Sequence, residues 1–460
     1  MRKMTLGEFA SRCKGALHAT AETEITGFAT DHREVKAGDL FIAIRGARVD
    51  GHTFAAEAIS SGAVACLVES APAGDMPHIL VDNVAEGLAA FARSLRGEFT
   101  GHVVGVTGSS GKTSTKEFLA AALSPLGPVL KTEGNRNSEW TSPLIWAELL
   151  PEHRSVVVEM GMRGFGQIRH LCSFAQPNIG VITNIGYSHL EQVGSREGIA
   201  TAKGELLEAL PSNGTAVLWA EDEYLSTLRG KTGARVVTFG RSAGADCRVE
   251  HYRALSLTKS WIKGTCLGQP FEGEFATVGW HQAINAAAAI AAAVAAGVEA
   301  DEAAKQLSSA QLPPMRMEIV NLNGAIVLLD NYNASFPGML AAIETLRELP
   351  TMGRKMAVLG EMRELGEFTI SAHQQVGKAL VEANLYKVMF YGMPMTFARR
   401  ELVAAGARDE RTPFATELQD ITEFLRELDP GDLVLIKGSR ALEIEKALQP
   451  LLPATAGGAS

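Results

Sequence analysis

The sequence contains few cysteine residues, and their placement excludes two common kinds of stabilisation. Five cysteines occur in 460 residues, an odd number, and no two of them form a Cys-x-x-Cys pair. Scattered single cysteines build neither a disulfide framework nor a structural zinc site, and they are typical of a reducing compartment. We therefore expect a cytoplasmic protein. The cysteines are Cys13, Cys66, Cys172, Cys247 and Cys266.

The chain also lacks an excess of positive charge and a long apolar run. Its 43 lysines and arginines are outnumbered by 52 aspartates and glutamates, for a net charge of −9. This balance argues against sequence-independent nucleic-acid binding, which requires basic surface to displace counterions from phosphates. The most apolar stretch, residues 283–298, is mainly alanine and is interrupted by Asn285, so it is too short and too weakly apolar to span a bilayer. We expect a buried helix there and no membrane insertion.

Short apolar runs alternate with helical stretches in three blocks, which we place at residues 1–98, 99–313 and 314–460. This rhythm predicts crossover connections and α/β domains with mainly parallel sheets. Pro313-Pro314 marks the second boundary, and a frayed tail is expected at residues 453–460. The predicted strands are 39–44, 63–68, 78–81, 103–106, 155–158, 179–183, 325–329, 355–359, 387–391 and 433–437, and the predicted helices are 84–95, 112–123 and 283–298.

The strongest local signal, Gly105-Val-Thr-Gly-Ser-Ser-Gly-Lys-Thr-Ser-Thr, lies between a predicted strand and a predicted helix. Such a turn presents backbone N–H groups and a helix N-terminus to phosphate oxygens. Lys112 then reaches the outer phosphates and the Thr113 hydroxyl reaches Mg²⁺. Val106 occupies the first glycine position of the usual G-x-x-x-x-G-K-[ST] pattern, yet the Gly-Lys-Thr core favours ATP binding over a simple connection. The loop residues expected at the nucleotide are Thr107, Gly108, Ser109, Ser110 and Gly111.

Two further polar side chains follow predicted strands, at the edge where open parallel sheets bind ligands. Glu159 ends the apolar run Ser155-Val-Val-Val-Glu, and His189 follows the next strand. A carboxylate beside Thr113 is a natural Mg²⁺ ligand. A solvated strand end or a helix cap would explain Glu159 as well, and a lone histidine is usually structural.

Lys203 lies on the apolar face of a predicted helix, together with Ile199, Leu206, Leu207 and Leu210. A buried ammonium group there would be costly, and its pKa should fall. Alternatively, the stem packs on the face while the charged head reaches solvent. Taken alone, the residues favour this second, structural interpretation.

Together these motifs resemble those of the Mur ligases, the ATP-dependent amide-forming enzymes of peptidoglycan precursor assembly. The similar segments are the shifted loop 107–113, Gly134-Asn-Arg-Asn, Glu159-Met-Gly, Asn184-Ile-Gly-Tyr-Ser-His and Ala202-Lys-Gly-Glu. The resemblance covers nearly the whole chain, and it implies three α/β domains. Residues 1–98 would bind a UDP-sugar, residues 99–313 would form a central P-loop domain with a mainly parallel sheet, and residues 314–460 would form a Rossmann-like domain that binds the acceptor and closes the site.

The same resemblance implies roles for individual residues. Asn285 would lie against the base of ATP, Arg316 would contact its phosphates and Asp330 would lie near its ribose. One Mg²⁺ would be held by Thr113 and Glu159 and a second by His189 with Lys203, whose carbamylation reverses the structural interpretation. The implied catalytic residues are Lys112, His189, Lys203 and Arg316. The implied substrate-binding residues are Asp31, Arg33 and Asp50 in the first domain, Asn135 and Asn137 in the second, and Tyr332 and Asn333 in the third.

One branch of the family fits best. Tyr332-Asn-Ala resembles the branch that joins D-alanyl-D-alanine to UDP-N-acetylmuramoyl-tripeptide through an acyl phosphate, and we expect a monomer. The alternatives are another Mur-type or a folylpolyglutamate-type ligase, or an ATP-binding regulatory subunit that ligates nothing. Departures from the family pattern concern the peptide substrate rather than ATP chemistry. They are His32, Ser138-Glu-Trp-Thr, Ser335-Phe336 and Glu361.

Overall fold

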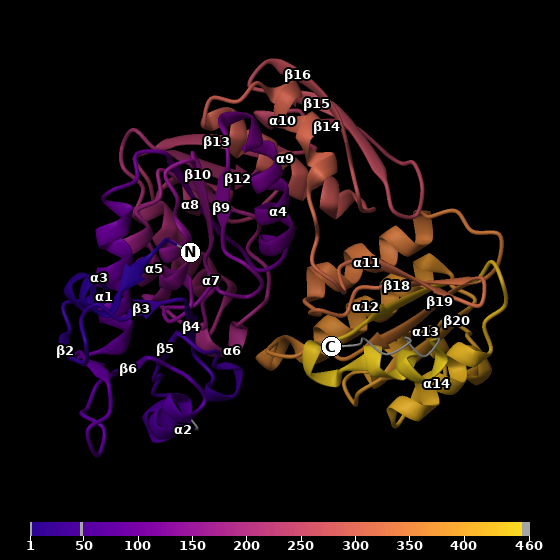
Figure 1. Cartoon of the computed structure of the whole chain (residues 1–460). Helices are drawn as coiled ribbons and strands as arrows, with labels where there is room; N and C mark the ends of the chain where they lie inside the picture. Colours follow the sequence, from indigo (N-terminus) through magenta and orange to yellow (C-terminus); the bar gives the residue numbers. More distant parts are fainter. Residues whose placement is uncertain (1, 47–48, 453–460) are drawn as a thin grey trace.

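The computed structural model describes residues 2–46 and 49–452, so the tail expected at 453–460 lies outside the described residues. Within them the strands form three large sheets and one small two-stranded sheet. In Figure 1 the N-terminal and central parts gather on one side, and the orange-to-yellow C-terminal part forms a lobe beside them. The α/β class with mainly parallel sheets is confirmed, because most neighbouring strands in each large sheet run parallel.

The N-terminal sheet has the strand order β2-β7-β6-β5-β4 and is parallel except at the β2–β7 edge. Its inner strands β5 and β6 are buried along their whole length, as apolar runs covered on both faces should be. The elements of this part are β1 (Met4–Thr5), α1 (Leu6–Cys13), β2 (Ala16–His18), β3 (Glu24–Ile25), β4 (Gly27–Ala29), β5 (Asp39–Ile42), α2 (Ala55–Ser60), β6 (Ala65–Val68), β7 (His78–Leu80) and α3 (Val84–Arg96).

The central sheet has nine strands in the order β16-β15-β14-β13-β12-β11-β8-β10-β9. The strands from β9 to β14 are parallel, whereas β14, β15 and β16 pair antiparallel. Because β8 lies between β10 and β11, the segments that follow these three strands meet at one edge. The strands are β8 (His102–Thr107), β9 (Val129–Lys131), β10 (Ser155–Glu159), β11 (Ile179–Ile182), β12 (Thr215–Trp219), β13 (Arg235–Gly240), β14 (Cys247–Ala254), β15 (Ser260–Cys266) and β16 (Gln269–Phe275).

Helices cover both faces of the central sheet. Val104 and Val106 of β8 pack into a core with α4 and α9, while Val103 packs into a core with α5 and α7, as the alternation of strand side chains requires. The alanine-rich stretch forms the buried helix α9, as predicted. The helices are α4 (Lys112–Ala122), α5 (Gln167–Ala175), α6 (Leu190–Val193), α7 (Arg196–Glu208), α8 (Leu225–Arg229), α9 (Trp280–Ala295) and α10 (Ala300–Gln306).

The C-terminal sheet has the order β17-β18-β22-β19-β20-β21, with only β17 antiparallel to its neighbour. The four strands predicted here are present at or within a residue of their predicted bounds. The elements are β17 (Glu318–Leu322), β18 (Ala325–Leu329), α11 (Phe336–Glu348), β19 (Lys355–Gly360), α12 (Thr369–Ala383), β20 (Lys387–Tyr391), α13 (Met395–Ala404), β21 (Phe414–Ala415), α14 (Leu418–Arg426) and β22 (Leu433–Lys437).

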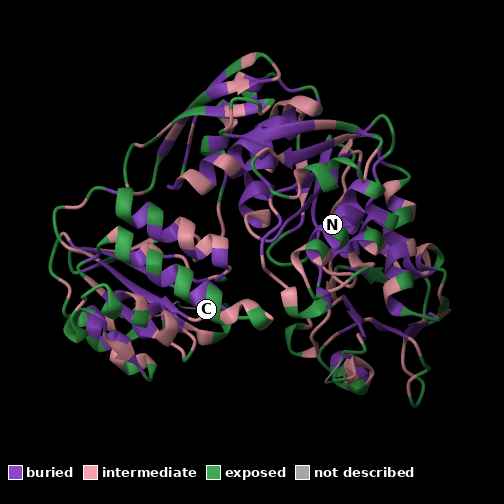
Figure 2. Cartoon of the chain, turned by 180° about the vertical axis from the view of Figure 1, so that it is seen from behind, coloured by how far each residue is buried: buried purple, intermediate pink, exposed green. Residues whose placement is uncertain are grey.

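The apolar cores are distributed unevenly among these parts. One core runs without interruption from α1 and α3 of the N-terminal part to α5 and α7 of the central part. The C-terminal sheet, in contrast, has its own cores on its two faces. Figure 2 shows this burial as purple bands along the sheets. Burial of this kind attaches the N-terminal part firmly to the central part. The C-terminal lobe is joined by its linker and by a smaller apolar contact, in which Val278 and Leu257 of the central part belong to or pack against one core of the lobe. Among the described residues no helix combines the length and apolarity that a bilayer crossing requires.

Candidate active site

The glycine-rich loop joins β8 to α4 and is held by the segment that follows β11. Asn184 accepts hydrogen bonds from the backbone N–H groups of Ser109 (3.0 Å) and Ser110 (3.1 Å). A Cβ atom on Gly108, whose φ is +152°, would lie 1.8 Å from Thr183 Oγ1, so only glycine fits. A Cβ atom on Gly111, at the start of α4, would lie 2.5 Å from Asn285 Oδ1. The predicted base-binding residue therefore stands directly against the loop.

Two lysines, the buried Lys203 and the partly buried Lys112, point at the same carbonyl oxygen of this loop. The Nζ atoms of Lys112 and Lys203 donate to the oxygen of Gly108 over 2.9 Å and 3.0 Å. Burial lowers the pKa of Lys203 well below its ordinary value, and the charge of Lys112 lowers it further. The pKa of Lys112 is lowered too, chiefly by burial. Lys203 is only 1% exposed, so the interpretation of its head reaching solvent is wrong.

Glu159 ends β10 beside the loop and is almost completely buried. Its Oε1 accepts from Asn137 Nδ2 over 2.9 Å, and its backbone N–H donates to Thr132 Oγ1 over 3.0 Å. Its Oε2 is buried without a hydrogen-bond partner. A buried carboxylate oxygen without a hydrogen bond fits a further cation, because a buried charge that is not hydrogen-bonded costs free energy. The structure thus brings Asn137 and Glu159 together.

Lys116 is a residue of this neighbourhood that the sequence analysis missed. It lies one turn into α4, is fully buried, and donates from Nζ to the backbone oxygen of Thr132 over 2.6 Å. The same Nζ lies 3.3 Å from Glu117 Oε1 and 3.8 Å from Glu159 Oε2. Glu117 also pairs with Lys131. Charges alternate along this chain of contacts, which explains how four ionic side chains can be accommodated here.

Arg316, in the linker to the C-terminal lobe, reaches the central site. Its Nη2 donates to Thr113 Oγ1 over 3.0 Å, and its guanidinium carbon lies 4.4 Å from the ring centre of Tyr332. Its Nε is buried without a hydrogen-bond partner. Lys437 Nζ contacts Asp330 Oδ2 over 2.6 Å and the backbone oxygen of Asn333 over 3.1 Å. The lobe therefore brings Arg316 and Tyr332 to the loop, while Asp330 and Asn333 share one lysine.

His189 stands at the start of α6 with a φ of +66°. Its Nδ1 lies 2.9 Å from Oε2 of Glu364, a residue of the C-terminal lobe. Lys203 is hydrogen-bonded to Gly108 instead. The sharing of one Mg²⁺ by His189 and Lys203 therefore stays a prediction, and Glu364 is a neighbour that the sequence analysis did not name.

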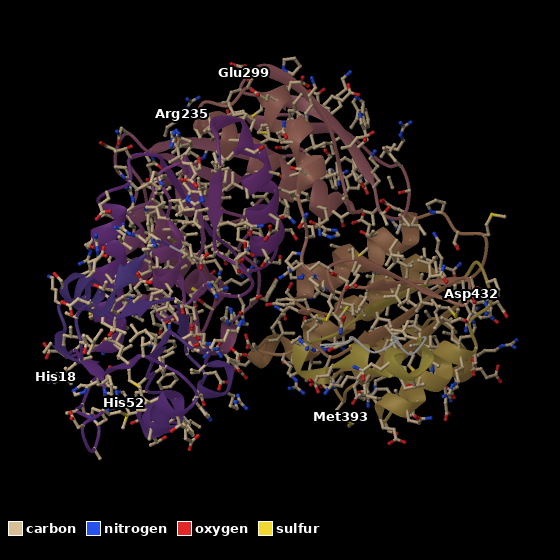
Figure 3. All side chains as sticks on the ribbon, in the orientation of Figure 1. His18, His52, Arg235, Glu299, Met393 and Asp432 are labelled. Carbon is tan, nitrogen blue, oxygen red and sulfur yellow. The ribbon has the colours of Figure 1, made fainter. Side chains whose placement is uncertain are left out.

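Of the remaining candidate residues, three lie in the N-terminal part and Asn135 lies beside Asn137. Asp31 and Arg33 form an ion pair with each other at 2.5 Å, and Asp50 accepts from His52 Nδ1 over 2.6 Å. Figure 3 shows His52 on the N-terminal part, on the opposite side of the molecule from Asp432 of the C-terminal lobe. Asn135 is exposed, and its backbone oxygen accepts from the N–H of Asn137 over 2.7 Å.

A glycine-rich loop between strand and helix, with a buried carboxylate at the end of the neighbouring strand, defines a phosphate-loop α/β protein. Three family models then match along the chain: the Mur ligase catalytic domain at residues 24–96, the Mur ligase middle domain at 106–293 and the Mur ligase glutamate ligase domain at 315–440. The chain belongs to the Mur ligase family, and the resemblance predicted from its motifs is confirmed.

Individual relatives agree over the full length. The chain is 35% identical to the UDP-N-acetylmuramoyl-tripeptide–D-alanyl-D-alanine ligase of Bacillus subtilis, over 98% of this chain and 99% of that one. The crystal structure of MurF from Acinetobacter baumannii matches with a TM-score of 0.87 and 28% identity, covering 98% and 99% of the two chains. MurF of Thermotoga maritima in complex with ADP matches with a TM-score of 0.79 and 31% identity, covering 92% and 96%. The predicted ligase class is confirmed.

Proposed function

We propose that this chain is an ATP-dependent ligase that joins D-alanyl-D-alanine to UDP-N-acetylmuramoyl-tripeptide in cytoplasmic peptidoglycan precursor synthesis. The observation that carries the proposal is the contact of Arg316 with Thr113, which brings the C-terminal lobe to the phosphate loop in a chain similar over its full length to ligases of this name. A regulatory subunit that only binds ATP has no need of this contact, nor of the two lysines hydrogen-bonded to Gly108.

The nucleotide would lie on the loop 107–113, with its phosphates on the backbone N–H groups at the start of α4 and on Lys112. Asn285 would meet the base, because its side chain adjoins Gly111. Asp330 would lie near the ribose. The similar Thermotoga maritima structure is a complex with ADP, which supports adenine-nucleotide binding by this chain.

Mg²⁺ fits the residues present. Thr113 supplies a hydroxyl and Glu159 a buried oxygen without a hydrogen-bond partner, which are the hard oxygen ligands that this ion prefers. No group of three or more His, Cys, Asp or Glu side chains converges on a metal position among the residues described, so phosphate oxygens and water would complete the coordination. When bound, Mg²⁺ would neutralise charge on the phosphates.

Lys203 is proposed to act as a carbamate that joins His189 at a second Mg²⁺. Two amines share one carbonyl, and burial favours the neutral amine, which is the form that reacts with CO₂. A carbamate would convert a costly buried cation into an anion with two oxygens.

The reaction joins a carboxylate to a triphosphate, two anions that repel one another. The terminal carboxylate of the tripeptide attacks the γ-phosphate of ATP, which forms an acyl phosphate and releases ADP. The amine of D-alanyl-D-alanine then attacks the acyl carbon, and phosphate leaves. Lys112 and Arg316 supply positive charge and alignment for the first step, which are most of what phosphoryl transfer requires from a protein.

The other substrate contacts are proposals that follow the family pattern. Asp31, Arg33 and Asp50 would hold the UDP-sugar end. Asn135, Asn137, Tyr332 and Asn333 would contact the peptide, and the chain would act as a monomer. The ion pair between Asp31 and Arg33 supports a common role, since it presents both side chains on one loop.

Release of ADP, measured with each candidate acceptor in turn, tests the function. We expect turnover with UDP-N-acetylmuramoyl-tripeptide and D-alanyl-D-alanine together, and background release when either is omitted. Equal turnover with single amino acids or with a folate substrate would show that the chain belongs to another class of ligase. ATP binding without turnover on any acceptor would support the regulatory alternative.

A further inference from the structure

Two non-glycine residues with left-handed backbone meet across the boundary between the central part and the C-terminal lobe. Glu364 follows β19 with a φ of +62°, and His189 precedes α6 with a φ of +66°. Their side chains lie 2.9 Å apart, between Oε2 and Nδ1. Left-handed residues with a side chain are uncommon and collect at functional sites, where the surrounding structure holds them in place. This geometry aims both side chains at one point.

Contacts other than this ion pair hold the Glu364 loop in position. Phe368, at the end of the short turn Gly366–Phe368, stacks on Tyr187 with ring centres 4.0 Å apart and an interplanar angle of 9°. Phe336 meets both rings edge-on, at 5.5 Å and 5.4 Å. Gly366 also lies against Glu191 of α6, and Figure 1 shows the lobe reaching α6 there. The aromatic cluster thus places the loop, and Glu364 is available for another task.

Glu364 is a carboxylate of this loop that contacts His189 through Oε2, which leaves its Oε1 for a second contact. Its side chain is 51% exposed, and one of its oxygens faces His189. Two other acids from the same edge of the lobe have basic partners, Glu361 on Arg363 at 2.7 Å and Asp330 on Lys437 at 2.6 Å. The phosphate loop itself is bordered by Lys112 and Arg316, whose positive charges attract phosphate and repel an ammonium group.

The acceptor dipeptide reaches the enzyme with a positively charged amino group, which must be placed beside the acyl carbon. We propose that Glu364 binds this ammonium group and holds the acceptor amine at the junction of the two parts, beside His189. The inference rests on the proposed function and adds to it the residue that recognises the acceptor.

The test compares Glu364→Gln with Glu367→Gln, an exposed neighbour on the same turn. Glutamine keeps the shape of the side chain and removes its charge. We expect Glu364→Gln to raise the KM for D-alanyl-D-alanine about 10- to 100-fold, the scale of one lost charge-assisted hydrogen bond. The KM values for ATP and for the tripeptide substrate should stay within about twofold in this variant. Glu367→Gln should leave all three unchanged, and Glu364→Asp should recover part of the loss.

A dipeptide without the ammonium group separates recognition from a structural role. N-acetyl-D-alanyl-D-alanine, used as a competitive inhibitor, should have the same Ki against Glu364→Gln as against the unaltered enzyme. If the KM for the acceptor and this Ki rise together, or all three KM values rise together, Glu364 only joins the two parts and the proposal is wrong. An unchanged acceptor KM would also overturn it. Failure of the unaltered chain to use D-alanyl-D-alanine at all would instead refute the proposed function.

Discussion

Replacement of Lys116 by methionine tests the buried charges around Glu159. Lys116 Nζ lies 3.3 Å from Glu117 and 3.8 Å from Glu159, and each contact corresponds to about 4–5 kcal/mol of attraction at an effective dielectric constant of 20. Desolvation of the charges offsets much of this attraction in the folded protein. Removing only Lys116 takes away the one cation within 4 Å of Glu159 among the described residues, whereas Glu117 keeps Lys131. Breaking a buried pair in this way costs about 3–5 kcal/mol.

Thermal unfolding of the ligand-free chain measures this cost. A loss of about 3–5 kcal/mol should lower the midpoint by on the order of 10 °C. Lys131→Met is the matched control, because Lys131 is partly exposed and its removal leaves Glu117 with Lys116. The control should show a clearly smaller shift.

A second variant identifies the charge that is left unpaired. Glu159→Gln combined with Lys116→Met removes both charges, so the double variant should be less destabilised than the sum of the two single variants. Strict additivity, or a shift below about 2 °C for Lys116→Met, would refute the argument that Lys116 compensates Glu159.

Three further predictions concern the remaining site. Lys203→Ala should fold but lose nearly all ligation activity. Small carboxylic acids should restore part of this activity, because they supply the missing oxygen ligands. Nearly unchanged activity of the alanine variant would exclude the carbamate. Arg316→Ala should lower kcat about 10²- to 10³-fold, because it removes one donor that stabilises charge in the transition state. Its affinity for ADP, measured by calorimetry, should change much less. An equal loss of kcat and of ADP affinity would show that Arg316 acts in ground-state nucleotide binding. Burial lowers the pKa of His281 to about 4, below its ordinary value of 6.5. Between these two pH values the histidine is protonated in the unfolded chain and neutral in the folded chain. Stability should therefore fall by about 1.4 kcal/mol per unit as pH drops from 6.5 towards 4, and His281→Gln should lack this slope in urea titrations.

Much of the fold could be predicted because many parallel strands appear in the sequence as short, continuous apolar runs. The strands β8, β10, β18, β19, β20 and β22 lie within a residue or so of their predicted bounds. The parallel strands β9, β12 and β13 were not predicted, and neither were the antiparallel strands β14, β15 and β16. In β14 buried and exposed residues alternate from Cys247 to Glu250, so the signal has a period of two and the run does not look apolar. The antiparallel edge strand β17, mostly half-exposed, was missed for a similar reason.

The site was predictable as far as it depends on neighbours in sequence. The apolar helix face around Lys203 correctly indicated that its amine could be buried. The hydrogen-bond partner of that amine, Gly108, lies 95 residues away in the sequence, and only the fold brings the two together. Lys116 was missed because a charged residue in the first turns of a helix usually faces solvent. The contact of His189 with Glu364 depends on how the lobe is placed against α6, which no local pattern specifies.

Transfer of an isotope from the tripeptide to phosphate tests the central claim most directly. UDP-N-acetylmuramoyl-tripeptide labelled with ¹⁸O in its terminal carboxylate would be incubated with ATP, Mg²⁺, D-alanyl-D-alanine and the enzyme, and the released phosphate analysed by mass spectrometry. An acyl phosphate requires one carboxylate oxygen to leave with the phosphate. The account therefore predicts one ¹⁸O atom in each phosphate and one in the new amide of the pentapeptide product. Unlabelled phosphate released alongside that product would contradict it.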